Sequence, residues 1–204
     1  MNFYKVARAV VNAFLKIAFR IKVEGIENIP REGALVVCAN HKSLCDPPML
    51  ALSLPFELRF MAKEELFKNK LFGGLIGALG AFPVKRGTGD IGALKIAIKV
   101  LTEGNRLVIF PEGSRSPKGY MGKGKSGAAL IAVKSKANIL PIGICGKYKL
   151  FSKIVVRIGK PIVLEEYFGT KLSSETLQDI TDNKIMRTIS ELSGVPVYED
   201  RDSQ

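Results

Sequence analysis

The residue pattern changes twice, from a strand to a polar loop and then to a helix start, within the segment Ala34-Leu35-Val36-Val37-Cys38-Ala39-Asn40-His41-Lys42-Ser43-Leu44-Cys45-Asp46-Pro47. Residues 34–39 are apolar and rich in β-branched side chains, which predicts a buried strand. Asp46 followed by Pro47 predicts the start of a helix, with Asp46 as its N-cap and Pro47 at the first helical position. Folds built from such strand–loop–helix units place their sites outside the carboxyl ends of the strands, which is where residues 40–45 would lie.

Strand and helix patterns alternate along the rest of the chain. Further strands are expected at residues 21–24, 58–62, 106–110, 138–144 and 153–158, and helices at 2–20, 46–54, 63–70, 88–103, 126–136 and 173–192. This alternation predicts an α/β fold with a mixed, largely parallel central sheet flanked by helices. Residues 71–84 carry no charge and four glycines. They suit a buried or interfacial segment, with room for an alkyl chain beside the glycines, or a tightly packed core helix.

The helix expected at residues 2–20 is amphipathic. Its apolar side carries Phe3, Val6, Ala7, Val10, Val11, Phe14, Ile17 and Ala18, and its polar side Lys5, Arg8, Asn12, Lys16 and Arg20. Charges interrupt it too often for a membrane span, and no clean cleavage site marks it as a signal peptide. We therefore expect residues 1–20 to form a membrane-interface element and residues 21–204 to form one α/β domain. The alternative is a helix packed on its own domain.

The charge balance is the unusual feature of the composition. Of 204 residues, 47% are hydrophobic and 25% charged, which is ordinary, but the formal net charge is +12. Such a balance indicates an anionic partner: a membrane surface, a nucleic acid or acidic ligands and proteins. No nucleic-acid recognition motif is present, so nucleic acid is not an expected partner. The cysteines Cys38, Cys45 and Cys145 form no CxxC pair, which favours a reducing, cytosolic location.

His41 is the only histidine in the chain, so any imidazole acid–base chemistry must take place there. Asp46 lies five residues further on, and in a turn that closes into a helix its carboxylate can fold back onto the imidazole. Such a contact fixes the tautomer and favours the charged ring. The alternative is an ordinary turn histidine beside a helix cap.

A second polar loop follows the strand expected at residues 106–110. It reads Phe110-Pro111-Glu112-Gly113-Ser114-Arg115-Ser116, and it should face the His41 loop across the same edge of the sheet. Its guanidinium is suited to binding phosphate. Lys85 and Arg86, beside Gly87, add two more cations. The alternative is that both are solvated basic loops.

Two other patterns, one typical of nucleotide binding and one of a nucleophilic cysteine, are weak evidence for those functions. Residues 119–126 match the phosphate-loop pattern G-x-x-x-x-G-K-S, but that motif needs a strand immediately before it, and Pro117 stands in the preceding segment. We expect a basic loop that opens the next helix rather than a nucleotide site. Cys45 could act as a nucleophile beside His41, although an inert cysteine is the commoner outcome.

Four blocks of residues carry a family resemblance. They are Asn40-His41-x-Ser43-x-x-Asp46-Pro47, Phe82-x-x-x-Arg86-Gly87, the segment 110–116, and Leu140-Pro141-Ile142-Gly143-Ile144. In this order they resemble the glycerolipid acyltransferases, and most closely the bacterial 1-acyl-glycerol-3-phosphate acyltransferases. The one small departure is Ser114, where threonine is commoner.

The resemblance implies an enzyme that transfers an acyl group from a thioester to the sn-2 hydroxyl of lysophosphatidic acid, giving phosphatidic acid for phospholipid synthesis. His41 would be the general base and Asp46 its partner, without a covalent acyl-enzyme. The acceptor-binding residues implied are Arg86, Glu112, Gly113, Ser114 and Arg115, with Asn40, Ser43 and Lys85 in supporting roles and Leu71, Phe72, Leu75 and Leu79 along the acyl chain. No metal or other cofactor is implied, and the co-substrate would be acyl-CoA or acyl carrier protein carrying the acyl group.

Together these features predict a peripheral or monotopic enzyme on the cytoplasmic face of the cell membrane, in contact with anionic lipids. One alternative is an enzyme that acylates another lysolipid or glycerol 3-phosphate. Another is a non-catalytic basic module that binds anionic lipid. The histidine, its aspartate and the Glu-Gly-Ser-Arg loop argue against the module, because lipid binding alone needs only cations and apolar area.

Overall fold

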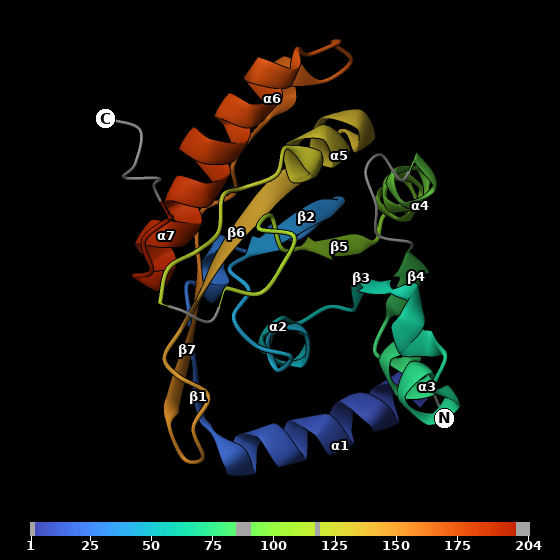
Figure 1. Cartoon of the computed structure of the whole chain (residues 1–204), viewed down its shortest axis with the longest axis vertical. Helices are drawn as coiled ribbons and strands as arrows, with labels where there is room; N and C mark the ends of the chain where they lie inside the picture. The colour runs from blue at the N-terminus through green and yellow to red at the C-terminus, as the bar shows by residue number, and fades with distance from the viewer. Residues whose placement is uncertain (1–2, 85–90, 117–118, 199–204) are drawn as a thin grey trace.

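The computed structural model describes residues 3–84, 91–116 and 119–198 (Figure 1). Within these residues one seven-stranded sheet has the strand order β1-β7-β6-β2-β5-β3-β4. The strands are β1 (Arg20–Glu24), β2 (Leu35–Ala39), β3 (Leu58–Lys63), β4 (Ala81–Val84), β5 (Arg106–Ile109), β6 (Asn138–Cys145) and β7 (Lys153–Ile158). Neighbouring strands are parallel except β6 and β7, which are antiparallel. The prediction of a mixed, largely parallel sheet is therefore confirmed.

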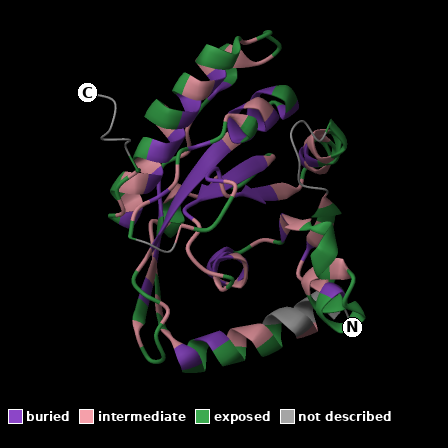
Figure 2. Ribbon diagram, in the orientation of Figure 1, coloured by how far each residue is buried: buried purple, intermediate pink, exposed green. Residues whose placement is uncertain are grey.

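Helices cover both faces of this sheet. They are α1 (Phe3–Ala18), α2 (Asp46–Ser53), α3 (Lys70–Ala78), α4 (Ile91–Thr102), α5 (Gly127–Ser135), α6 (Ser174–Asp179) and α7 (Arg187–Ser193). One core cluster joins the sheet to α4, α5, α6 and α7, and the other joins it to α1 and α2. Figure 2 shows the buried central strands between these layers. Val36 and Cys38 of β2 point to the first cluster and Leu35, Val37 and Ala39 to the second, as the two-residue period of a strand requires.

The register of the three central strands brings their carboxyl ends together. Cys38 of β2 is paired with Ile109 of β5, and Ala39 with Ile142 of β6. The loops that follow β2, β5 and β6 therefore leave the sheet at the same edge. This edge is where the sequence places its polar loops.

The region between β3 and α4 differs from the expectation in two ways. Residues 63–70 were expected to be helical, but only Glu64–Phe67 form a 3₁₀ turn, and α3 begins at Lys70. Its start is set by Asn69, whose Oδ1 accepts hydrogen bonds from the N–H groups of Leu71 and Phe72. Residues 71–84 then divide into α3 and the edge strand β4 at Gly80, which has a positive φ of 87°.

Two further boundaries were predicted incorrectly. The structure places Cys45 in the N-cap position and makes Asp46 the first residue of α2, because the Asp46 carboxylate turns back into the preceding loop. The expected helix at 173–192 is interrupted by the π-helical stretch Ile180–Met186 between α6 and α7. The helix expected at 88–103 is described from Ile91 onward, and its first residues lie outside the described part of the chain.

Helix α1 has two apolar faces rather than one. Leu15 and Ala18 are buried in the core cluster beside α2, whereas Val10, Phe14 and Ile17 are exposed to solvent. The helix is thus packed on its own domain and also presents apolar surface outward. None of the helices in the described residues has the length and hydropathy needed to cross a bilayer.

Candidate active site

The loops after β2, β5 and β6 meet at the carboxyl edge of the sheet, and Asn40 joins the first to the last. Its side chain is buried, with Oδ1 accepting from the Ile144 N–H at 2.7 Å and Nδ2 donating to the Ile144 carbonyl at 3.1 Å. A side-chain amide that satisfies both backbone groups of Ile144 extends the pairing of β2 with β6. It also fixes the position at which the chain enters the His41 loop.

His41 and Asp46 are paired, with Nδ1 of the imidazole 2.9 Å from Oδ2 of the carboxylate. Asp46 is fully buried, and the His41 side chain is 13% exposed. The same Oδ2 accepts hydrogen bonds from the N–H groups of Lys42 and Ser43, both at 2.7 Å. Burying a carboxylate costs free energy unless its oxygens are hydrogen-bonded, and the turn that precedes α2 provides those donors.

Tyr148, in the loop after β6, donates its hydroxyl to Oδ1 of Asp46 at 2.7 Å. Burial, and then the charge of Asp46, raises the pKa of Tyr148 above its usual range, which keeps the hydroxyl protonated as a donor. Sequence reasoning missed this residue. Its signal was its place just beyond the carboxyl end of a strand, the same rule that drew attention to residues 110–116.

The loop after β5 holds His41 from the other side. The imidazole stacks on the Phe110 ring, with centroids 4.0 Å apart. Glu112 is buried; its Oε1 accepts from the His41 N–H at 2.7 Å and its Oε2 from the Gly122 N–H at 2.9 Å. The Ser116 N–H donates to the His41 carbonyl at 2.8 Å. Both backbone groups of His41 are therefore fixed by the segment predicted to face it.

Of the remaining residues predicted to bind the acceptor, Gly113, Ser114 and Arg115 lie on the loop that holds His41. Gly113 has a positive φ of 70° and turns the loop, and Ser114 and Arg115 are exposed on it. Arg115 immediately precedes Ser116, so its backbone lies beside the His41 loop. Lys85 and Arg86 fall outside the described residues.

Lys42 and Ser43 hold the His41 loop in place, Lys42 through bonds to β6 and the residues after it and Ser43 through a bond within the loop. The Lys42 ammonium donates to the carbonyl oxygens of Ile144 at 2.8 Å and Gly146 at 2.6 Å. Burial lowers the pKa of Lys42, with the charge of Asp46 acting in the opposite direction. Ser43 Oγ accepts from the Cys45 N–H at 3.1 Å. Lys42 thus ties the His41 loop to the end of β6, alongside Asn40.

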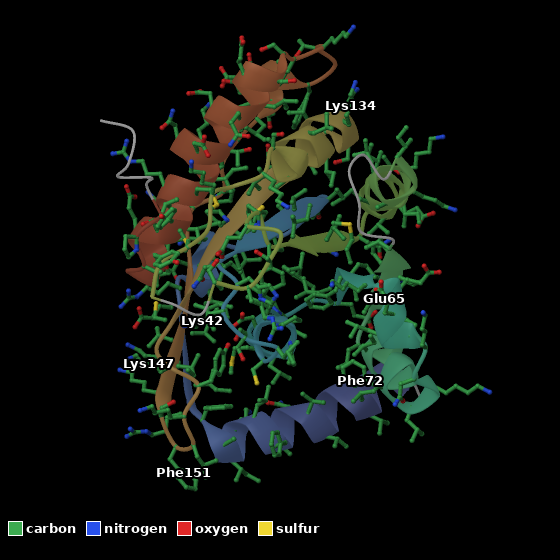
Figure 3. All side chains as sticks on the ribbon, in the orientation of Figure 1. Lys42, Glu65, Phe72, Lys134, Lys147 and Phe151 are labelled. Atoms are coloured by element: carbon green, nitrogen blue, oxygen red, sulfur yellow. The ribbon has the colours of Figure 1, made fainter. Side chains whose placement is uncertain are left out.

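The predicted acyl-chain residues lie on and beside α3, which contacts α1. Leu71 is 89% exposed, Phe72 and Leu75 are also exposed, and Leu79 is half-buried. Figure 3 labels Phe72 beside the N-terminal part of α1. These side chains are an apolar surface next to the exposed face of α1, and their contact with an acyl chain stays a prediction.

The phosphate-loop pattern does not form a phosphate cradle. Strand β5 ends at Ile109, well before Gly119, and the Gly122 N–H is used by Glu112. The segment leads into α5 as a loop, as expected. Cys38 is buried in β2, where burial raises the pKa of its thiol. In the described part of the chain, no group of three or more His, Cys, Asp or Glu side chains is placed to hold a metal ion.

The fold and the site define the chain as an α/β protein with a His–Asp pair at the carboxyl edge of its sheet. Comparison with known proteins gives its family. The family model described as Acyltransferase matches residues 20–145, which include the loops after β2 and β5 and the whole of β6. The chain belongs to the acyltransferase family.

Three relatives illustrate the similarity. The 1-acyl-sn-glycerol-3-phosphate acyltransferase of Bacillus subtilis (strain 168) is 33% identical over 185 residues, covering 88% of this chain and 92% of the relative. The enzyme of the same name from Streptococcus pneumoniae is 33% identical over 154 residues, covering 72% of this chain and 56% of the relative. The crystal structure of the 1-acyl-sn-glycerophosphate (LPA) acyltransferase PlsC from Thermotoga maritima matches with a TM-score of 0.73 at 30% identity, covering 93% of this chain and 79% of that one.

Proposed function

We propose that the protein transfers an acyl group from a thioester to the sn-2 hydroxyl of lysophosphatidic acid, forming phosphatidic acid. The names of the relatives support this acceptor. The observation that carries the proposal is the His41–Asp46 pair, held at 2.9 Å at the carboxyl edge of the sheet. Acyl transfer to a hydroxyl needs a positioned base, and His41 is the only histidine in the chain.

In the proposed reaction the Nδ1–H of His41 donates to Asp46, which leaves Nε2 to act on the substrate. As the acceptor hydroxyl attacks the thioester carbonyl carbon, Nε2 takes the hydroxyl proton. The C–S bond then breaks, and the departing thiolate receives that proton from the imidazolium. Asp46 stabilises the charged ring while it exists.

No covalent acyl-enzyme is needed in this scheme, because a thiolate is already a good leaving group. Cys45 lies in the turn before α2, where its N–H donates to Ser43. We therefore expect Cys45→Ala to keep its activity and His41→Ala to lose most of it. Asp46→Asn should also lose activity, but less than His41→Ala.

For the acceptor, we propose that Arg115 and Arg86 bind the phosphate, with Lys85 nearby and Gly113 and Ser114 at the glycerol. The exposure of Arg115 on the loop that clamps His41 supports this role. Glu112, Asn40 and Ser43 would act differently, because each of these side chains is hydrogen-bonded to the backbone of the site. Their proposed role is to position the His41 loop.

We also propose that the enzyme is peripheral on the cytoplasmic face of the membrane, with residues 1–20 as its interface element and 21–204 as the catalytic domain. The outward apolar face of α1 and the net charge of +12 support an anionic bilayer as partner. The exposed side chains Leu71, Phe72 and Leu75, with Leu79 behind them, would lie along the acyl chain. The donor would be acyl-CoA or acyl carrier protein bearing the acyl group.

The test is a thiol-release assay with purified protein, lysophosphatidic acid and an acyl thioester, using His41→Ala as the control. Acyl-CoA and the acyl carrier protein thioester are compared as donors, and other lysolipids and glycerol 3-phosphate as acceptors. Acceptor-dependent thiol release that His41→Ala lacks is the expected result. Faster release with another acceptor would assign the site to that substrate, and no release with any pair would favour the non-catalytic lipid-binding module.

A further inference from the structure

The loop between β6 and β7 ends in two exposed apolar side chains that the proposed reaction does not use. Leu150 is 69% and Phe151 63% exposed. They lie two and three residues beyond Tyr148, which holds the Asp46 carboxylate. The same loop therefore begins in the site and ends in an apolar tip on the surface.

The tip is fixed to the end of α1. The Phe151 N–H donates to the Ala18 carbonyl at 2.7 Å, and Arg20 Nε donates to the Phe151 carbonyl at 3.1 Å. A third bond joins the Arg20 N–H to the Ser152 carbonyl at 2.9 Å. Phe151 has a positive φ of 62°, a conformation that residues other than glycine rarely adopt. These backbone bonds hold the tip in a conformation that leaves the Leu150 and Phe151 side chains in solvent.

The tip continues the outward face of α1. Phe14 and Ile17 are exposed on the last turns of that helix, next to Ala18. Figure 2 shows exposed residues along α1, and Figure 3 labels Phe151 beyond the C-terminal end of that helix. The backbone bonds place the apolar tip at the end of the helix that carries Phe14 and Ile17, although Arg20 and Phe151 are 131 residues apart.

Cations surround this apolar surface. Lys147 and Lys149 flank the tip on the loop, Lys153 follows it, and Lys16 and Arg20 lie on the α1 side, all exposed. A hollow of about 440 Å³ next to Arg20 is lined by Lys16 and Arg20 and by apolar side chains such as Phe19 and Leu52. An apolar centre with a basic rim matches the interface of an anionic bilayer, where acyl tails lie beneath phosphate groups.

We propose that the loop at residues 147–152 is a second membrane contact, inserting Leu150 and Phe151 into the interface of an anionic bilayer beside α1. This rests on the proposed function in one respect, because a lipid acceptor places the substrate in the bilayer. It adds a contact between the membrane surface and the site. The bilayer would hold Leu150 and Phe151 at the tip of the loop, and Tyr148 in the same loop bonds to Asp46.

The first test uses the absence of tryptophan from the chain. In Leu150→Trp the introduced side chain is the only tryptophan, so its fluorescence reports on the tip alone. With vesicles of phosphatidylglycerol and phosphatidylcholine, its emission should move to shorter wavelength, and lipids brominated in the acyl tails should quench it. Val163→Trp is the matched control, because Val163 is also exposed but lies far from the tip. Its neighbour Ile162 pairs with Ile139 near the start of β6, whereas the tip loop follows the end of β6. An unshifted Leu150→Trp spectrum, in a protein that sediments with the vesicles, would overturn the proposal.

The second test measures how much the contact contributes. Leu150→Ser/Phe151→Ser should reduce partitioning into these vesicles by about tenfold or more in a sedimentation assay. Ile26→Ser/Val163→Ser removes two exposed apolar side chains elsewhere and should partition like the unchanged protein. Equal losses in both variants, or none in the first, would contradict the proposal. A protein dimer that forms without vesicles and that only Leu150→Ser/Phe151→Ser abolishes would also contradict the proposal, because a second copy of the chain would then cover the tip.

These measurements do not depend on turnover. A protein that shows no thiol release but inserts its tip refutes the proposed function and keeps the membrane contact. Thiol release with a tip that stays in water does the opposite. If both hold, turnover of the tip variant should fall more on acceptor in vesicles than on acceptor in detergent micelles.

Discussion

At the scale of single residues, the buried carboxylate of Asp46 organises the site. It joins the histidine, two backbone N–H groups of its own loop and the hydroxyl of Tyr148. Because the donors come from two loops, the orientation of the carboxylate is fixed before any substrate arrives. The histidine that we propose as general base, held in this way, would need little reorganisation during the reaction.

Tyr148→Phe tests this arrangement. The substitution removes one donor to a buried charged group, a bond worth about 1.5–3 kcal/mol, while the ring remains to pack edge-on against Phe19. We expect kcat to fall about tenfold and the Michaelis constant for lysophosphatidic acid to change little. Steady-state kinetics measure both. Tyr120→Phe is the control, because the Tyr120 ring packs at a tilt against Tyr198, away from Asp46. A change confined to the Michaelis constant would show that Tyr148 acts on binding.

Arg115→Lys tests the proposed phosphate contact. Lysine keeps the charge but lacks the planar fork that binds two phosphate oxygens at once. The Michaelis constant for lysophosphatidic acid should therefore rise by about tenfold, and that for the acyl thioester should stay within about twofold. Arg31→Lys, on the exposed turn before β2, should leave both unchanged. Equal increases for donor and acceptor would remove Arg115 from the acceptor site.

The His41–Asp46 pair was predictable because the two residues are close in sequence and a helix start brings the chain back on itself. Tyr148 was not, because it is 102 residues from Asp46, and their contact depends on the pairing of β2 with β6. The hydrogen bonds of Glu112 and Asn40 could not be predicted for the same reason, because each joins segments that are far apart in the chain. Apart from the contact of Asp46 with His41, the sequence identified the polar loops but not the groups that the Glu112 carboxylate and the Asn40 amide would meet.

At the scale of elements, the boundary between α3 and β4 shows where pattern reading fails. Residues 81–84 include Pro83, which argues against a strand, but β4 is an edge strand, where a missing N–H is tolerated. The apolar character of 71–84 continues across both elements, so composition gives no break. The break comes from the backbone at Gly80, where a Cβ would collide with the Leu58 carbonyl oxygen.

Gly80→Ala and Gly74→Ala should therefore change stability in opposite directions. At Gly80 the positive φ and the Leu58 carbonyl both oppose a side chain, and we expect a loss of about 1–3 kcal/mol. Gly74 lies within α3 with open space around its Cβ position, so alanine should add about 0.5–1 kcal/mol. Urea denaturation followed by circular dichroism measures both. Equal effects of the two substitutions would mean that Gly80 is not a required breakpoint.

The two faces of α1 should likewise separate stability from membrane binding. Leu15→Ala removes a buried core side chain and should cost about 2–4 kcal/mol of unfolding free energy. Phe14→Ser/Ile17→Ser alters only the outward face and should leave that free energy within about 0.5 kcal/mol while weakening vesicle sedimentation. A Phe14→Ser/Ile17→Ser protein that sediments normally would make α1 a core element alone.

At the scale of the whole molecule, the net charge of +12 should make membrane binding depend strongly on salt. Raising the ionic strength from about 0.1 M to about 1 M shortens the Debye length from about 10 Å to about 3 Å. Sedimentation with phosphatidylglycerol vesicles should fall steeply over this range, and sedimentation with pure phosphatidylcholine should be weak throughout. Binding that is insensitive to both salt and lipid charge would leave the basic surface without a role at the membrane.

The position of β1 at the edge of the sheet also has a consequence for biosynthesis. In the described structure β1 pairs with β7, so Arg20 meets its partner only after Lys153 has left the ribosome. Until then the end of α1 lacks the bond from the Phe151 N–H to the Ala18 carbonyl, although α2 and α3, which also contact α1, are already in the chain. Contacts this distant in sequence form late and slow the folding of a domain. A nascent chain of this protein would therefore carry α1 without its attachment to the β6–β7 loop through most of its translation, and the bilayer could receive the outward face of that helix before the site exists.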